Sequence, residues 1–444
     1  MKIKTKHRSC EEVMELPRPA HRKPMKPSRL LAAAVRLVSA PDLKDVGFTY
    51  LKKNMERAGE GPWLILMNHS SFLDLEMVSE MLKDRPYNIV CTSDGLVGKE
   101  AIMRRLGCIP TQKFVTDPTL IADLQHALNV NKTSVLMYPE ASYSFDGTTT
   151  PLPRRLGILL RKLKVPVVMI KTFGSFTRDP LYNNLQKRKV TCCATMECLL
   201  TPEEIMTKSV PEMDAILDKA FDIDYFRWQK EKNIRVTEPF RADGLNRILF
   251  KCPCCLSEGQ TEGRGTRLTC RACGAEFEMD ELGQLSWVSE SNSVAQSSTI
   301  PFNLSHIPSW YAWERECVRQ DILEGRYLLD TEVDIGLLVD YKALYLVGSG
   351  RLRHDKNGFL LEGCEGKLRY SQPPTACYSL YSDYFWYEIG DVVCIGNKDC
   401  LYYCFPKQKD VVAKTRMAQE EIFKILKEQK RERRLQGNSE AETT

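Results

Sequence analysis

A histidine and an aspartate, His69 and Asp74, are the first residues of this sequence whose types and spacing could do chemistry. His69 follows a short apolar run, residues 63–67, which is long enough for one buried strand, and Asp74 falls in a helix expected over residues 72–81. Both side chains are therefore expected at a strand-to-helix corner, where the carboxylate can meet the ring. A carboxylate on one ring nitrogen fixes the tautomer and leaves the other nitrogen free as a base. Such a base can take a proton from a hydroxyl that the substrate supplies.

The same spacing also has a purely structural interpretation. His69 could cap the helix while Asp74 faces solvent, and for so short a pattern this is the more common case. The apolar run that ends at Asn68 and the order of the segments downstream favour the catalytic interpretation.

Composition limits the class of protein. A chain of 444 residues is expected to form two or three domains, and a formal net charge of +5 is too small for a strongly basic nucleic-acid-binding protein. The 17 cysteines, without a clear secretory signal before them, favour reduced thiols and metal ligands over a disulfide framework. No apolar stretch reaches the roughly 20 residues that a spanning helix needs, so any lipid chemistry is expected at a membrane surface.

Strand and helix patterns alternate over residues 30–245, which predicts an α/β domain with helices covering a largely parallel sheet. Strands are expected at residues 63–67, 87–92, 134–138, 165–170 and 189–199. Helices are expected at residues 99–106, 118–128, 154–164 and 202–221.

This region resembles the glycerolipid acyltransferase family, of the 1-acylglycerol-3-phosphate type, over about residues 30–228. The first family motif, Asn-His-x-x-x-x-Asp, is matched by Asn68, His69 and Asp74. The other matches follow in the family's order: Lys99, Gly107 and Ile109, with Lys113 at a usual arginine position; Pro139-Glu140-Ala141-Ser142-Tyr143; and Val165-Pro166-Val167.

The resemblance implies an acyltransferase-type mixed sheet and an O-acyltransferase reaction. His69, oriented by Asp74, would be the general base for a hydroxyl of a lysophospholipid or glycerol-phosphate-type acceptor, which attacks an acyl thioester of coenzyme A or of acyl carrier protein. Backbone amides near Ser70 are the expected donors to the oxyanion. The implied substrate-binding residues are Asn68, Lys113, Glu140, Ser142 and Tyr143.

The expected partners are the acceptor, the acyl carrier and a membrane surface, with no nucleic acid. The expected location is cytoplasmic, peripheral on the inner face of a membrane.

The third motif departs from the family pattern Pro-Glu-Gly-Thr-Arg. Tyr143 stands where the family has an arginine that helps to hold the acceptor's phosphate, and a tyrosine cannot donate a charged, bidentate pair. Ala141 replaces a glycine that lets the backbone approach a ligand. Lys113, Arg154 and Arg155 are the candidates to supply the missing charge. This departure keeps open a second hypothesis, a non-catalytic lipid-binding or scaffolding protein built on the same fold.

A zinc ribbon is expected at residues 246–288. Two Cys-x-x-Cys knuckles have the spacing of a tetrahedral zinc site, whose ligands would be Cys252, Cys255, Cys270 and Cys273. Cys254 is an additional thiol that could replace a neighbour. Four thiolates leave no open position, so the zinc would be structural. The alternative is a pair of reduced surface knuckles without metal.

The remaining segments are predicted from composition. Residues 1–29 form an extended basic arm, and the helix after it either packs on the core or lies in a membrane interface. Residues 289–305 form a linker, and residues 306–436 form a β-rich domain with a C-terminal helix, similar to the strand barrel of pleckstrin-like domains. Residues 437–444 are expected to be disordered.

Overall fold

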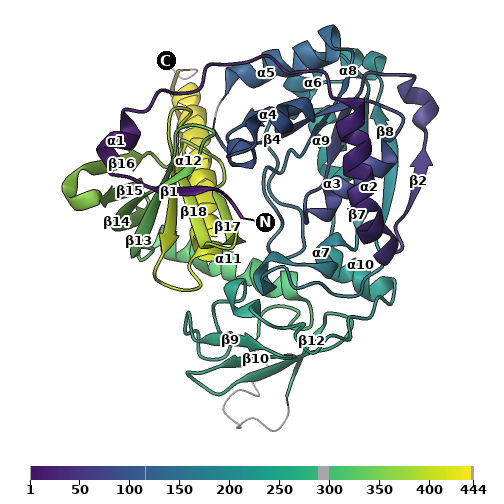
Figure 1. Cartoon of the computed structure of the whole chain (residues 1–444). Coiled ribbons are helices and arrows are strands. Elements are labelled where there is room, and N and C mark those ends of the chain that lie inside the picture. The colour runs from purple at the N-terminus through teal and green to yellow at the C-terminus, as the bar shows by residue number, and fades with distance from the viewer. Residues whose placement is uncertain (1, 116, 289–299, 442–444) are drawn as a thin grey trace.

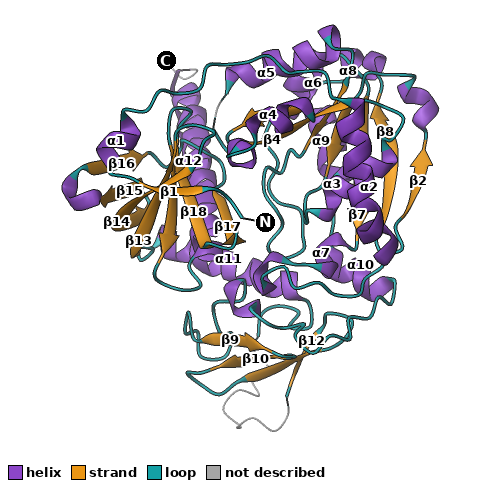
Figure 2. Ribbon diagram, in the orientation of Figure 1, coloured by secondary structure: helices purple, strands orange, loops and turns teal. Residues whose placement is uncertain are grey.

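The computed structural model describes residues 2–115, 117–288 and 300–441 and shows three parts (Figure 1). An α/β domain lies on the right of the view, a large sheet with two helices lies on the left, and a small four-stranded sheet lies below them. Figure 2 shows that helices surround the sheet of the α/β domain, whereas the small sheet is connected mainly by loops. The predicted fold class, a mixed α/β sheet followed by a cysteine-rich ribbon and a β-rich domain, is confirmed.

The sheet of the α/β domain has seven strands in the order β2-β8-β7-β3-β6-β4-β5. β3 is parallel to both of its neighbours, β6 and β7, and all four of its residues are buried, which explains its unbroken apolar sequence. β8 runs antiparallel to β7, so the sheet is mixed. The strands are β2 (Thr49–Lys53), β3 (Leu64–Met67), β4 (Tyr87–Thr92), β5 (Cys108–Thr111), β6 (Ser134–Met137), β7 (Val167–Phe173) and β8 (Cys193–Leu200).

Alternate residues of β3 pack into different cores, because successive side chains of a strand point to opposite faces. Leu64 and Leu66 belong to a core with residues of α5, α6 and α9, whereas Ile65 and Met67 pack with residues of α3. The helices are α2 (Arg29–Asp45), α3 (Leu73–Met81), α4 (Glu100–Arg105), α5 (Pro118–Gln125), α6 (Leu156–Leu163), α7 (Ser175–Arg178), α8 (Pro202–Thr207), α9 (Val210–Ala220) and α10 (Tyr225–Glu231). Short helical turns are η1 (Met55–Ala58), η2 (Ser93–Leu96), η3 (His126–Val130), η4 (Leu181–Asn183), η5 (Leu245–Arg247) and η6 (Cys364–Gly366).

The N-terminal arm is folded against both large domains, which differs from the extended arm expected from the sequence. β1 (Thr5–His7) adds a parallel strand to β14 of the C-terminal sheet, and α1 (Cys10–Met14) follows it. The chain then crosses to the α/β domain, where Asn88 Nδ2 donates to Met25 O (2.8 Å). The prolines do prevent a continuous helix, but the backbone groups between them find partners in the rest of the chain.

The ribbon is a four-stranded antiparallel sheet that docks on both neighbours. On one side, Val236 N donates to Glu281 O (2.8 Å). On the other side, Trp310 Nε1 donates to Lys251 O (3.1 Å). The strands are β9 (Thr261–Arg264), β10 (Arg267–Cys270), β11 (Glu276–Met279) and β12 (Leu285–Trp287).

The C-terminal domain is an open sheet rather than the closed barrel suggested by the sequence. Its order, β16-β15-β14-β13-β19-β18-β17, leaves β16 and β17 at opposite edges. Buried residues of α11 and α12 share one core with residues of the sheet, so these helices cover the face that a barrel would enclose. The elements are α11 (Ile307–Leu323), β13 (Leu329–Leu338), β14 (Leu344–Asp355), β15 (Gly358–Gly363), β16 (Leu368–Gln372), β17 (Tyr381–Trp386), β18 (Gly390–Gly396), β19 (Leu401–Pro406) and α12 (Val412–Ala441).

Two predicted segments fall partly outside the described residues. Most of the expected linker, residues 289–299, is one, and the end of the expected disordered tail, residues 442–444, is the other. The first part of that tail is helical, because α12 continues to Ala441. Among the described residues, no helix combines the length and the apolarity needed to cross a bilayer.

Candidate active site and metal site

The residues expected at the active site gather where the parallel strands end. His69 follows β3, Tyr143 lies on the loop after β6, and Lys113 follows β5. Parallel strands present their carboxyl ends at one edge of a sheet, and ligands of open α/β sheets bind outside this edge. The topology therefore brings together residues that lie up to 74 positions apart in the sequence.

His69 and Asp74 form the expected pair. The distance from His69 Nδ1 to Asp74 Oδ2 is 3.2 Å, and Asp74 is completely buried in the first turn of α3. The same carboxylate oxygen accepts the backbone amides of Ser70 (2.8 Å) and Ser71 (3.1 Å). An ionised carboxylate can only accept, so Nδ1 carries the proton and Nε2 is left as the basic nitrogen. No described residue makes a hydrogen bond to Nε2, and His69 lines a large cavity.

Burial lowers the pKa of His69 below its ordinary value, although the hydrogen bond to Asp74 acts in the opposite direction. Desolvation disfavours the charged imidazolium. The ring is therefore neutral at neutral pH, which is the protonation state that a general base requires.

Two tyrosine rings pack against the imidazole of His69. The ring of Tyr138 is stacked on it at a centroid distance of 3.9 Å, and the ring of Tyr143 lies at 4.3 Å with a tilt of 50°. Burial raises the pKa of both tyrosines well above 10, so both hydroxyls stay protonated and can donate. The sequence analysis missed Tyr138. The only local signal for it was an aromatic residue at the end of a predicted strand, just before Pro139.

Asn68 and Glu140 lie behind the cavity and fix the backbone that carries His69. The side-chain amide of Asn68 joins β3 to β7, because it donates to Thr172 O (3.1 Å) and accepts from Thr172 N (2.9 Å). Glu140 accepts the backbone amide of His69 (3.1 Å) and that of Thr150 (2.8 Å). Burial raises the pKa of Glu140 to about 7. These hydrogen bonds hold the backbone on either side of His69 in place, and neither side chain lines the cavity.

Ser142 is also buried behind the cavity, where its hydroxyl donates to Tyr143 O (3.2 Å). Its neighbour Ala141 has a φ of 54°, in the left-handed region that favours glycine. The backbone at this position keeps the conformation that explains the family's glycine, even though this chain has an alanine there.

Of the three basic residues considered for the missing charge, Lys113 lines the cavity and the two arginines do not. Arg154 is 79% exposed and pairs with Asp218 (3.4 Å), and Arg155 is exposed as well. The ammonium of Lys113 lies 4.2 Å from the centroid of the Tyr381 ring, and burial lowers its pKa.

The amides of Ser70 and Ser71 are not free to bind an oxyanion. Both donate to the Asp74 carboxylate, so the sequence-based assignment of amides near Ser70 to this role is wrong. The hydroxyl of Tyr138 is buried and has no hydrogen-bond partner among the described residues.

The cavity has a volume of about 1930 Å³ and lies between the α/β domain and the C-terminal domain. Its wall includes residues of α2 and α3, the ends of β4 and β5, the loop after β6, the turn after β17 and one side of α12. This volume is larger than that of most small-molecule sites and can hold long apolar chains.

Comparisons with known proteins match this region. Residues 48–171 match the family described as Acyltransferase. The chain is 27% identical over 158 residues to human 1-acyl-sn-glycerol-3-phosphate acyltransferase beta, a match that covers 34% of this chain and 54% of that protein. These matches support the resemblance of residues 48–171 to the glycerolipid acyltransferase family. The chain spans about half the length of this curated relative.

The chain also matches a solved structure. It is the crystal structure of the 1-acyl-sn-glycerophosphate acyltransferase from Thermotoga maritima, with 13% sequence identity and a TM-score of 0.34. The match covers 43% of this chain and 76% of that one.

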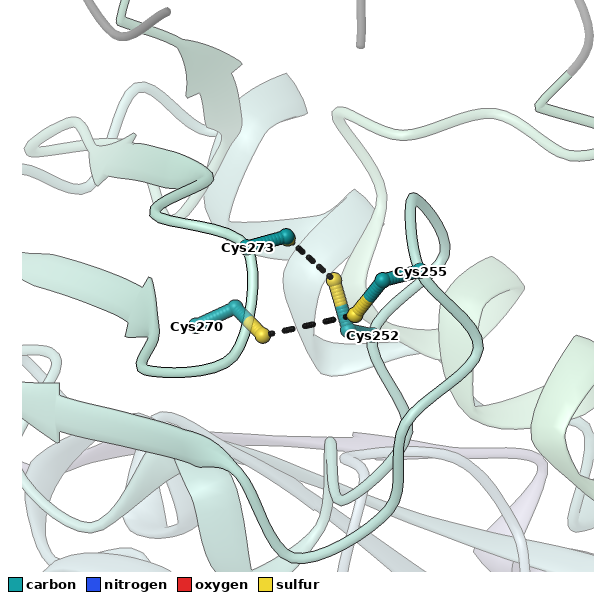
Figure 3. Close-up of side chains that lie close together, drawn as sticks. All are labelled: Cys252, Cys255, Cys270 and Cys273. Atoms are coloured by element: carbon teal, nitrogen blue, oxygen red, sulfur yellow. Dashed lines mark hydrogen bonds between the residues drawn. The ribbon is translucent and has the colours of Figure 1, made fainter. Parts of the chain in front are cut away.

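A separate cluster of four cysteines lies in the ribbon (Figure 3). The sulfur atoms of Cys252, Cys255, Cys270 and Cys273 all lie within 4.8 Å of one another. The Sγ atoms of Cys252 and Cys273 are 3.8 Å apart, and those of Cys255 and Cys270 are 3.7 Å apart. Zinc–sulfur bonds of about 2.3 Å in a tetrahedron place the sulfurs about 3.8 Å from one another. The cluster therefore fits a tetrahedral metal ion, whereas Cys254 lies outside it.

We expect one structural zinc ion per chain in this cluster. The double variant Cys252→Ser/Cys255→Ser should lose the metal and unfold at a lower temperature, because metal binding stabilises a ribbon with a small core. Metal analysis of the purified protein and thermal unfolding would measure both effects. Cys254→Ser is the matched control, since it changes a thiol of the same knuckle and should keep the metal. A native chain that is folded and free of metal would contradict the prediction.

Proposed function

We propose that this chain is an O-acyltransferase that acts at a membrane surface. It would move an acyl chain from coenzyme A or acyl carrier protein to a hydroxyl of a lysophospholipid or glycerol-phosphate-type acceptor. The main support is the His69–Asp74 pair. Its imidazole is neutral, its Nε2 has no hydrogen-bond partner among the described residues, and His69 lines a cavity large enough for acyl chains.

The proposed reaction needs only one proton shuttle. Nε2 of His69 takes the proton of the acceptor hydroxyl as its oxygen attacks the thioester carbonyl. Asp74 stabilises the imidazolium that forms and keeps the ring in the productive orientation. When the tetrahedral intermediate collapses, the carbon–sulfur bond breaks and the departing thiolate receives the proton from Nε2. The products are the ester and the free thiol.

The two tyrosines beside His69 are the proposed donors to the oxyanion. The amides of Ser70 and Ser71 are engaged by Asp74, whereas the hydroxyls of Tyr138 and Tyr143 are protonated and belong to residues that line the cavity. A donor aimed at the developing negative charge contributes more in a water-poor cavity than in solvent.

We expect His69→Ala to lower kcat by about 10²- to 10⁴-fold, the usual contribution of a general base. Asp74→Asn should also lower kcat strongly, because an amide permits the wrong tautomer. Transfer of a labelled acyl group to a panel of lysolipid acceptors would measure both effects, with circular dichroism to check the fold. His7→Ala, which changes an exposed histidine of β1, is the control. If His69→Ala keeps near-normal turnover, the mechanism is wrong. If the native chain transfers no acyl group but binds lipid, the non-catalytic hypothesis gains support.

Tyr138→Phe and Tyr143→Phe should each preserve ring packing and remove one hydroxyl. Loss of an oxyanion donor typically costs about 10²- to 10³-fold in kcat with little change in KM. Steady-state kinetics on the two variants and on the double variant would show which hydroxyl contributes. Full kcat in the double variant would exclude both tyrosines from this role.

The membrane contact is proposed for α2. Leu30, Leu37 and Val38 are 85%, 78% and 80% exposed, and they lie along the side of a helix that also contributes residues to the cavity wall. Phe72, at the edge of the same cavity, is 53% exposed. Exposed apolar side chains beside the mouth of a lipid site fit an interfacial helix, and Arg29 and Arg36 on α2 can attract anionic headgroups.

We expect the triple variant Leu30→Ser/Leu37→Ser/Val38→Ser to bind vesicles much less than the native chain. Sedimentation with anionic and with neutral vesicles, at low and at high salt, would separate the apolar from the electrostatic contribution. The control is Val130→Ser/Leu323→Ser/Leu328→Ser, which changes exposed apolar side chains of the same types elsewhere on the surface. Equal binding by the α2 variant and the control would place the membrane contact on another surface.

A further inference from the structure

The C-terminal domain supplies one wall of the cavity that contains His69. Asp383 of β17 lines this wall, together with Tyr381, Tyr384, Phe385, Trp386 and Tyr387 of the same strand and its turn. The Tyr381 hydroxyl donates to the Asp94 carboxylate (2.6 Å), which attaches this wall to the loop after β4 of the acyltransferase domain. The substrate cavity is therefore completed by residues that the family match does not include.

Lys113 and Asp383, which have opposite charges, are among the charged residues that line this cavity. Lys113 stands over the ring of Tyr381, and one oxygen of Asp383 accepts a backbone amide (2.9 Å). Neither Lys113 nor Asp383 forms an ion pair with any residue that the structure describes. Both are close enough to the reacting groups to act on them electrostatically, Lys113 on His69 and Asp383 on Tyr143.

The charges around Lys113 argue against an acceptor with a phosphomonoester. Such a group carries about two negative charges at neutral pH and needs more than one cation to compensate it. Other basic residues, such as Arg36 and Lys430, also line the cavity, but Lys113 is the one whose charge lowers the pKa of His69. The carboxylates of Asp94 and Asp383 both raise the pKa of Lys113. Arg416 also acts on Lys113, but it does not line the cavity and forms an ion pair with a glutamate of α12 (3.4 Å).

We propose that the acceptor is a lysophospholipid with a zwitterionic headgroup, whose phosphodiester binds Lys113 and whose ammonium group binds Asp383 and the aromatic wall beside it. This inference rests on the acyl-transfer function proposed above. A phosphodiester carries one negative charge and is matched by one lysine. An ammonium group is attracted both by a carboxylate and by the faces of aromatic rings.

The ionisation of Asp383 is consistent with a cationic ligand. Burial raises the pKa of Asp383 to about 7, against the opposing effect of Lys113. The carboxylate is therefore only partly ionised at neutral pH when the cavity holds no cation. A bound ammonium group would favour the ionised form and would be bound more tightly by it.

The test compares acceptors that differ only in the headgroup. Lysolipids of one acyl length would carry phosphate, phosphoethanolamine or phosphocholine, and kcat and KM would be measured with the full chain and a labelled acyl thioester. We expect kcat/KM for the two zwitterionic acceptors to exceed that for the phosphomonoester by about tenfold or more. A preference between the two zwitterions would show whether a primary or a quaternary ammonium fits better.

Two variants and a control show which residues cause the headgroup preference. Asp383→Asn should raise KM for the zwitterionic acceptors by about tenfold and lower KM for the phosphomonoester, because a negative charge is removed. Lys113→Met should raise KM for all three acceptors. Asp399→Asn changes an exposed aspartate of the same domain and should alter none of these values.

The outcomes separate this inference from the proposed function. A native enzyme that prefers the phosphomonoester overturns the zwitterionic headgroup and leaves acyl transfer intact. An equal change in KM for all three acceptors in Asp383→Asn would also overturn the zwitterionic headgroup and leave acyl transfer intact. If Asp383→Asn does not fold, the headgroup preference of the native enzyme, measured as kcat/KM, tests the inference. Absence of transfer to every acceptor from either type of thioester overturns the proposed function itself.

Discussion

The buried carboxylate of Asp74 is the constraint on which the site depends. It is completely buried, and an ionised group there is stable only when hydrogen bonds replace its water. The amides of Ser70 and Ser71, the ring of His69 and the hydroxyl of Thr172 (3.3 Å) provide those hydrogen bonds. The same bonds that stabilise the carboxylate shape the corner after β3 and orient the base. A change that loosens the corner would therefore affect stability and catalysis together.

The α/β domain and the C-terminal domain meet around this corner. Arg416 of α12 donates to Tyr143 O (3.3 Å), so the C-terminal helix contacts the loop whose tyrosine packs on His69. Tyr381 joins the C-terminal sheet to Asp94, and the N-terminal arm connects that sheet to the outer strands of the α/β domain. The C-terminal domain therefore lines one side of the cavity that contains His69, and the position of β17 and the turn after it affects the size and polarity of that cavity.

Local signals in the sequence predicted much of this arrangement. The unbroken apolar strand β3, the His-x-x-x-x-Asp corner and the paired cysteine knuckles each depend on residues that are close in sequence, so spacing alone indicates them. The folded N-terminal arm, the stacking of Tyr138 on His69 and the aromatic wall from β17 depend on contacts between segments far apart in the chain. Tyr381 and Asp94, for example, are 287 positions apart, and no periodicity records such a contact. The open C-terminal sheet was missed for the same reason, since strand patterns alone do not show which face the helices cover.

The replaced arginine of the third motif can be understood from the charges of the site. A guanidinium at position 143 would add a positive charge beside the imidazole of His69, which already has its pKa lowered by burial. It would also require a strongly anionic ligand to neutralise it. Tyr143 keeps the imidazole packed and adds a hydroxyl without a charge, and Lys113 remains as one cation opposite the carboxylates of Asp94 and Asp383. The loss of the arginine and the presence of a carboxylate from the C-terminal domain both make the charge around the headgroup less positive. Both changes disfavour a doubly charged phosphate and favour a headgroup that carries its own cation.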